Sequence, residues 1–207
     1  MARKEQATRT RQAVLAAAGE VFAERGYAGT NLSDVYGSVG VTKGGLYGHF
    51  SSKEELADAV VALEEERAAQ ISGEVLARTG TPLDTLIELS YRWAHEIQVN
   101  PVVRGGVWLI VERGRHEQAG AGPYRNWEAL AETLLRQAQA QHILRADLDC
   151  ARFAQSVIAS FTGLQLVSQI VSNHQDLPRR LDDYWDITLR GTLAEGTAPL
   201  SRKESTA

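Results

Sequence analysis

Cysteine and proline are scarce in this chain of 207 residues, and it has no long apolar run. Cys150 is the single cysteine, which excludes an internal disulfide and suits a reducing cytoplasm. No charged segment followed by an apolar run opens the sequence, and no apolar stretch reaches ~18 residues, so we expect neither a secretory signal nor a membrane span. With 5 prolines and 43% hydrophobic residues, the composition predicts a mostly helical protein that buries a core.

Motifs of catalysis and metal binding are missing as well. None of the 5 histidines has another histidine four residues away, and Cys150 has no cysteine partner, so we predict no metal site. The serine of Gly37-Ser38-Val39-Gly40 is at the wrong position for a nucleophile elbow. Gly44 and Gly45 do not follow a strand, so a phosphate-cradling loop is not indicated. We therefore expect no enzyme and no cofactor.

The first 50 residues contain a helix-turn-helix pattern. One apolar stripe at helical spacing predicts a first helix, formed by Val14, Leu15, Ala18, Val21 and Phe22. This helix should stop near Gly26, which suits a left-handed cap. Asn31 and Asp34 then open a second helix over 32–39, and Gly40 permits a sharp turn into a third. Short helices joined by such a turn are typical of proteins that read the DNA major groove.

The third predicted helix, residues 42–50, presents groups that suit DNA. Thr42 can cap its first turn, whose free amides themselves attract anions. Gly44 and Gly45 allow the backbone to approach another surface closely. Leu46 and Phe50 share the opposite face and should anchor the helix to a core. The side chains expected to reach phosphate are Lys43, Tyr47 and His49.

Charge is distributed unevenly along the chain. The net charge of −4 argues against a nucleic-acid partner, but residues 1–53 carry 7 basic and 4 acidic side chains. Residues 54–207 hold the remaining 15 basic and 22 acidic side chains. The positive surface is therefore N-terminal, and Arg9 and Arg11 lie in a basic arm or first helical turn that can touch DNA phosphates.

These residues resemble the DNA-binding domain of TetR-family repressors. The resemblance runs from Arg11 to Phe50, includes the stretch 40–50, and continues into 51–56, where that family begins a fourth helix. Gly48 departs from the family pattern, and a glycine inside a helix costs about 1 kcal/mol. The resemblance implies a helix-turn-helix domain over 1–53 and a ligand-binding and dimerisation domain over 54–207.

Further helices are predicted after Ser52, and no segment has the period of a strand. A capping pattern at Ser52 opens a long helix toward Leu76, and Pro82 begins the next. Shorter apolar patterns predict helices near 103–111, 127–138, 153–168 and 177–189, with a loop over 114–123. The expected fold is all-α.

Two segments of the second domain resemble the γ-butyrolactone autoregulator receptors, a TetR subfamily. They are residues 122–127 and 161–169, followed by Asp176-Leu177. The resemblance implies that Trp127 lines a ligand pocket and that Thr162 lies on a helix that walls it. The residues alone leave Trp127 open to a core role, and Thr162 open to a bond with its own helix. Gln165 and Gln169 share a face that serves either the pocket or the dimer interface, and we favour the interface.

The last two helices should form a homodimer, as they do in the family. The apolar residues offered for this interface are Val157, Leu164, Val167, Ile170, Val171, Tyr184, Trp185 and Leu189. Two-fold symmetry would present two recognition helices to a palindromic operator.

The sequence thus predicts a dimeric repressor that binds a double-stranded DNA operator. A small hydrophobic signal of the lactone, butenolide or furan type would release it, and antibiotic biosynthesis genes would be its targets. Two alternatives stay open. One is a regulator of an efflux pump that binds lipophilic drugs through acids such as Glu88, Glu96, Glu112 and Glu128. The other is a receptor-like regulator that senses an antibiotic or an intermediate.

Overall fold

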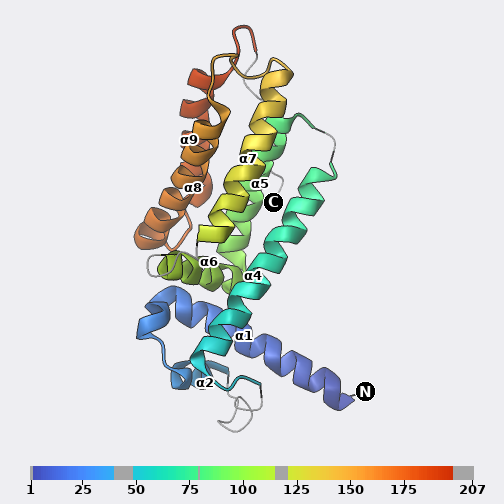
Figure 1. Ribbon diagram of the computed structural model, residues 1–207. Helices are drawn as coiled ribbons and strands as arrows, with labels where there is room; N and C mark the ends of the chain where they lie inside the picture. The colour runs from blue at the N-terminus through green and yellow to red at the C-terminus, as the bar shows by residue number, and fades with distance from the viewer. Residues whose placement is uncertain (1, 40–48, 79, 115–120, 198–207) are drawn as a thin grey trace. The chain divides into compact units, whose positions relative to one another are not determined.

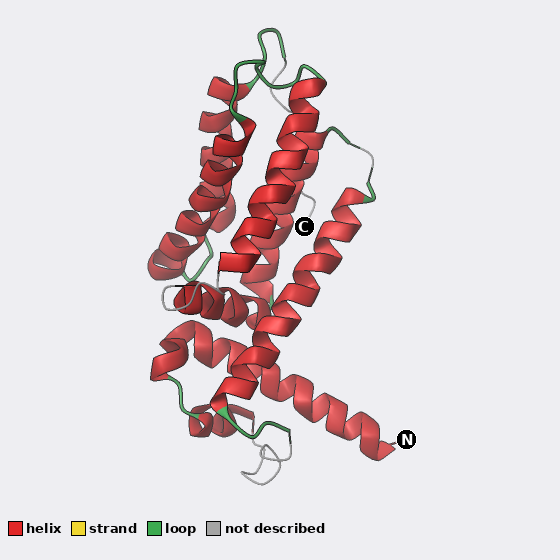
Figure 2. Cartoon of the chain, viewed as in Figure 1, coloured by secondary structure: helices red, strands yellow, loops and turns green. Residues whose placement is uncertain are grey.

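The structure is a computed structural model that describes residues 2–39, 49–78, 80–114 and 121–197. The described residues are helical apart from short connections, as Figures 1 and 2 show, and contain no strand beyond one isolated bridge between Leu144 and Leu193. The all-α prediction is confirmed. The helices are α1 (Ala2–Gly29), α2 (Leu32–Val39), α4 (Lys53–Leu76), α5 (Pro82–Val99), α6 (Pro101–Gly114), α7 (Gly122–Ala140), α8 (Cys150–Ser172) and α9 (Leu177–Thr192).

Most of the predicted helix boundaries are present. Helical geometry breaks at Gly26, whose φ of 69° is the positive value that favours glycine. The Asp34 carboxylate accepts a hydrogen bond from the Asn31 amide at 3.0 Å, at the start of α2. The hydroxyl of Ser52 accepts from the Glu55 amide at 3.1 Å, and Asp149 caps α8 by accepting from the Arg152 amide.

The chain folds into two compact units. Unit 1 comprises residues 1–72 and 95–122, and unit 2 comprises residues 73–94 and 123–207. Unit 1 therefore contains α6 in addition to the N-terminal helices. The predicted boundary between a DNA-binding domain that ends at residue 53 and a ligand-binding domain that begins at residue 54 concerns function rather than packing. It stays a prediction.

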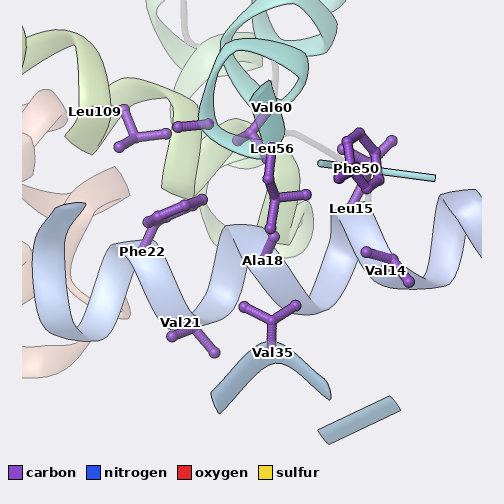
Figure 3. Close-up of a cluster of buried hydrophobic side chains, with 11 residues drawn as sticks. Val14, Leu15, Ala18, Val21, Phe22, Val35, Phe50, Leu56, Val60 and Leu109 are labelled. Carbon is purple, nitrogen blue, oxygen red and sulfur yellow. The ribbon is translucent and has the colours of Figure 1, made fainter. Parts of the chain in front are cut away.

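The core of unit 1 is built on the predicted stripe of α1 (Figure 3). All five stripe residues are buried, and they meet Val35 of α2 and Phe50. Leu56 and Val60 of α4 and Leu109 of α6 lie on one side of α1, and Val35 lies on the other. Since a buried leucine or phenylalanine stabilises the fold by about 1.5–3 kcal/mol, α6 is an integral part of this core.

Helices α1 and α6 approach each other backbone to backbone. A Cβ added to Gly19 of α1 would lie 2.3 Å from the carbonyl oxygen of Pro101. One added to Gly105 of α6 would lie 2.4 Å from the carbonyl oxygen of Gly19. Only glycine fits at these two positions, so the α1–α6 contact depends on them.

Unit 2 is tied together by polar contacts between α5 and α9. The indole Nε1 of Trp185 donates to Ser90 Oγ at 3.0 Å, and the Tyr91 hydroxyl donates to Asp182 at 2.6 Å. At the α8–α9 turn, Asp176 accepts from the hydroxyls of Ser168 and Ser172 at 2.5 and 2.7 Å. These hydrogen bonds, with those from Arg180, lower the pKa of Asp176 to about 2.

Candidate DNA-binding and ligand-binding sites

The candidate DNA-binding part of unit 1 begins with α2. Val35 anchors this helix in the core, with no exposed area, and Asp34 forms a 3.1 Å ion pair with Arg25 at the end of α1. The predicted recognition helix follows α2. Its residues Thr42, Lys43, Gly44, Gly45 and Tyr47 lie outside the described residues, so their DNA contacts stay predictions.

The end of that predicted helix is described. Phe50 is 2% exposed and belongs to the core, as its spacing predicted, whereas His49 is half-buried. Arg11 is exposed and its guanidinium lies 5.1 Å above the Phe50 ring, a cation–π contact. Arg9 is also exposed, and both arginines lie on α1, so the basic segment is helical from Ala2 onward rather than an extended arm.

The junction between α1 and α2 is held by a group of side chains that we call the Tyr27 cluster: Tyr27, Lys53, Glu112 and Arg113. The carboxylate of Glu112 accepts from the amides of Tyr27 and Ala28 at 2.6 and 3.4 Å. It acts as a cap for the helical turn that restarts after Gly26, a position that favours negative charge. Helix α6 thereby fixes the backbone that leads into α2.

Two cations complete the Tyr27 cluster. The Lys53 ammonium donates to the carbonyl oxygens of Tyr27 and Thr30 at 2.8 and 3.0 Å and lies 4.3 Å from the centre of the Tyr27 ring. Arg113 lies 5.9 Å from the same ring and pairs with Asp58 of α4 at 2.7 Å. Residues of α4 and α6 therefore converge on the α1–α2 junction.

Helix α4 also carries a buried acid. Glu64 is 4% exposed. The stem of its side chain packs against α6, since a Cβ added to Gly106 would lie 2.5 Å from the Cβ of Glu64. Burial raises the pKa of Glu64 to about 8, and the neighbouring charge of Glu65 acts in the same direction. Glu64 is therefore largely protonated at neutral pH.

A second polar link joins α4 to the start of α6. Arg67 donates to Glu96 of α5 at 2.5 Å, and Glu96 also accepts from the side-chain amide of Asn100. The Asn100 side chain in turn accepts from the Val102 amide at 3.1 Å, in the first turn of α6. The hydrogen bond from Arg67 is the main cause that lowers the pKa of Glu96, against the effect of burial.

In unit 2, Trp127 of α7 contacts Trp93 of α5. The ring centres are 5.8 Å apart with an angle of 42° between the rings. Trp93 is 8% exposed and Trp127 is half-buried. Trp93 is thus a core residue, whereas the Trp127 ring packs on it and keeps accessible surface.

Helix α8 carries the other residues singled out for ligand binding. The Thr162 hydroxyl donates to the carbonyl oxygen of Ile158 at 2.9 Å, which is the bond to its own helix that the sequence left open. Gln165 is buried at 4% exposure, and Gln169 is half-buried. The interface role favoured for Gln165 does not agree with its burial inside unit 2.

The exposed apolar surface of α8 and α9 differs in part from the predicted interface. Ile170 is 83% exposed and Ile187 is 73% exposed, and Val167 and Val171 are exposed beside Ile170. Val157 and Trp185 are instead buried at 4% and 3%, since they face the core of unit 2. Ile187 was absent from the predicted set because only the fold shows that it lies outside the core.

Two family descriptions match this chain. Bacterial regulatory proteins of the tetR family match residues 14–60, and the tetracyclin repressor-like C-terminal domain matches residues 80–194. The chain belongs to the TetR family. Members of this family are DNA-binding transcriptional regulators and not enzymes, and this TetR-family protein is a regulator of that kind.

The relatives of this TetR-family protein include lactone receptors. The A-factor receptor protein of Streptomyces griseus is 30% identical over 89% of this chain, which spans only 64% of that receptor's own length. A gamma-butyrolactone receptor described as ArpA-like matches with a TM-score of 0.81 and 30% identity, over 93% of this chain and 92% of that one. A structure described as the molecular basis for control of antibiotic production by bacterial hormones has a TM-score of 0.75 and 36% identity, over 90% of this chain and 98% of that one. The predicted resemblance to the γ-butyrolactone receptors is confirmed.

By length and composition alone, α8 of this TetR-family protein could cross a membrane, although the sequence predicted no membrane span. The helix also carries the buried polar residues Gln165 and Ser168, and Ser168 bonds to Asp176. Its exposed apolar side includes Ile170. We interpret this composition as that of a helix with one core face and one face suited to a protein partner.

Proposed function

We propose that this TetR-family regulator is a dimeric repressor, released from a palindromic operator by a small hydrophobic lactone, butenolide or furan signal. The observation that carries the proposal is the likeness to a gamma-butyrolactone receptor over 93% of the chain, which extends through the C-terminal half. A role in antibiotic biosynthesis is supported by the 36% identity to the structure concerned with control of antibiotic production.

DNA binding is assigned to the N-terminal basic region. Phosphate contacts come from Arg9 and Arg11 of α1 and from Lys43, Tyr47 and His49. Thr42, Gly44 and Gly45 bring the recognition helix against base edges. The exposure of Arg9 and Arg11 on α1 supports their part of this assignment.

The ligand is assigned to the surroundings of Trp127. Because the indole is half-buried against Trp93, it offers a flat apolar surface without leaving the core. An apolar ligand that covers such a surface gains roughly 25 cal/mol for each Å² removed from water. Each tenfold loss of operator affinity requires about 1.4 kcal/mol of difference in ligand affinity between the two states. A contact of modest area therefore supplies enough free energy.

The signal is proposed to reach the DNA-binding helices through α6. This helix directly precedes α7, which carries Trp127, and it is fixed to α1 through Gly19 and Gly105 and to the α1–α2 junction through Glu112. A ligand-bound state that displaces α6 would move α1 and α2 with it. The spacing of the two recognition helices in the dimer would then no longer match the operator.

The efflux-regulator alternative relied on acids available to cationic drugs. Glu96 is paired with Arg67, Glu112 is bonded to the Tyr27 amide, and Glu88 is paired with Arg78. Three of the four acids considered therefore have partners within the protein. Because these carboxylates are already paired, the site favours a neutral ligand over a lipophilic cation.

The test replaces Trp127 and follows ligand-induced release of a fluorescent operator duplex. Trp127→Ala should bind the operator like the wild type and need at least a tenfold higher lactone concentration for release, because it loses the flat indole surface. Trp127→Phe, which keeps an aromatic face, should lie between the two. Release of Trp127→Ala at wild-type lactone concentrations would overturn the ligand assignment. Release of the wild type by an antibiotic but by no lactone, butenolide or furan would favour the receptor-like alternative.

A further inference from the structure

Within the described part of the chain, Gln165 is the one residue of α8 with a buried side-chain polar atom that has no hydrogen-bond partner. Its side chain is 4% exposed, and its Oε1 atom accepts no hydrogen bond. Buried amide oxygens in folded proteins are nearly always bonded, because an unmade bond leaves the cost of removing the group from water uncompensated. The missing hydrogen bond at the Gln165 Oε1 atom therefore needs an explanation.

The neighbouring hydroxyls on the same helix do not supply the bond. Thr162, three residues before Gln165 and on the same face, donates its hydroxyl proton to Ile158 at 2.9 Å. Ser168, three residues after Gln165, donates its proton to Asp176 at 2.5 Å. Both hydroxyl protons are already donated, so neither hydroxyl group can donate to the Gln165 Oε1 atom.

A role in the contact between two protomers is excluded by position. The exposed residues of α8, Val167, Ile170 and Val171, are 45%, 83% and 64% exposed, whereas Gln165 faces the interior of unit 2. A second copy of the chain that covers the exposed face would not reach the Gln165 amide. A group that bonds the Gln165 Oε1 atom therefore has to reach it inside unit 2.

We propose that the Gln165 amide is a hydrogen-bonding anchor for a hydroxyl group of the ligand, an inference that rests on the proposed function. A hydroxyl group both donates and accepts, so it satisfies the amide whichever of its two ends points inward. The ligand class is a small, mainly apolar molecule with one hydroxyl group. Gln165 thereby selects among lactones of similar size, because a site built for a hydroxyl group discriminates against the analogue that lacks it.

The test pairs a protein change with a ligand change. The probes are a γ-butyrolactone with an alkyl chain and a hydroxymethyl group, and the same lactone with a methyl group in place of the hydroxymethyl. Wild-type protein should be released from a fluorescent operator by the hydroxymethyl lactone at a concentration at least tenfold lower than by the methyl lactone. Gln165→Met, which keeps the length of the side chain without its polar atoms, should lose this preference and respond to the methyl lactone at least as well as the wild type.

A measurement of thermal unfolding without ligand distinguishes a loss of ligand preference from misfolding of the variant. Unliganded Gln165→Met should unfold at or above the wild-type temperature, since it removes an unsatisfied buried group. Gln137→Met, the same change at an exposed position of α7, is the matched control and should keep the wild-type preference for the hydroxymethyl lactone. A Gln165→Met protein that unfolds well below the wild type would contradict the inference, because its amide would then be bonded within the protein.

The outcomes separate the inference from the function on which it rests. Wild-type protein that responds to both lactones equally, or a Gln165→Met protein that keeps the preference, overturns the role of Gln165 alone. Wild-type protein that stays on the operator with either lactone overturns the proposed function, and the inference with it.

Discussion

Single residues in this protein carry roles that depend on partners far away in the sequence. Glu64 shows this most directly, because its ordinary sequence context of Leu63 and Glu65 hides the fact that it faces α6. Its burial keeps a carboxylic acid protonated near neutral pH, with a pKa of about 8. The protein therefore gains a pH-dependent contribution to its stability.

Glu64 should make the free energy of unfolding fall as the pH rises from about 4.5 to about 8. Across this window the folded state holds a proton that the unfolded chain has released, so the stabilisation is complete below the unfolded pKa and is lost as pH passes through the folded pKa. Since one pKa unit corresponds to about 1.4 kcal/mol, the total effect is roughly 3–5 kcal/mol. Glu64→Gln should remove this slope in urea unfolding at a fixed protein concentration, while the exposed control Glu66→Gln should retain it. Parallel profiles for the wild type and Glu64→Gln would disprove the assignment.

For the candidate ligand-binding residues, the structure adds contacts and burial that the sequence did not predict. The resemblance pointed to Trp127 and Thr162, and the structure adds that the Thr162 hydroxyl is already bonded to its own helix. Gln165 was associated with the dimer interface, since helical spacing cannot tell which of two apolar faces points inward. Only the burial of its side chain separates the two roles.

At the scale of the elements, the sequence predicted most helix starts and ends because the signals are local. Gly26, Ser52 and Pro82 act within one turn of their own positions, and the structure has a break in helical geometry, a side-chain cap and a helix start there, respectively. The sequence pattern did not indicate that α6 packs within unit 1. Its contacts join residues about 85 positions apart, such as Glu112 and Tyr27, and no local pattern reports them.

The α1–α6 contact can be tested by a pair of glycine substitutions. Gly105→Ala should lower the free energy of unfolding by about 1–3 kcal/mol, because the new methyl group would meet the backbone of Gly19. Gly73→Ala in α4, where nothing lies within 4 Å of the new methyl group, should raise it by up to about 1 kcal/mol. Urea unfolding of the two variants measures both effects. Equal shifts in the two would mean that α1 and α6 do not need this close approach.

At the scale of the whole molecule, the proposed function requires a second copy of the chain. The exposed residues Ile170 and Ile187 lie on α8 and α9, the helices that the family resemblance assigns to dimerisation. The sequence predicted an interface on these two helices, but the predicted set mixed core residues such as Trp185 with exposed ones. The distinction depends on how α9 turns its faces toward α5, through the Trp185–Ser90 hydrogen bond.

Ile170→Glu should convert the protein to a monomer. Two carboxylates brought into an apolar interface would be unpaired, which costs several kcal/mol. Sedimentation should show a dimer for the wild type and a monomer for the variant, whose affinity for a full palindrome should fall at least tenfold. Val99→Glu, a matched change at a residue of α5 that is 58% exposed, should remain dimeric. A dimeric Ile170→Glu protein would place the interface on another surface.

The account as a whole depends on coupling between operator and ligand, and the most direct measurement is the affinity of the lactone for two forms of the wild-type protein. Calorimetry would compare the free dimer with the dimer saturated by operator DNA. Because coupling free energy is reciprocal, the operator should weaken lactone binding by the same factor, at least tenfold, by which the lactone weakens operator binding. Equal lactone affinity for the free and the operator-bound protein would contradict the account.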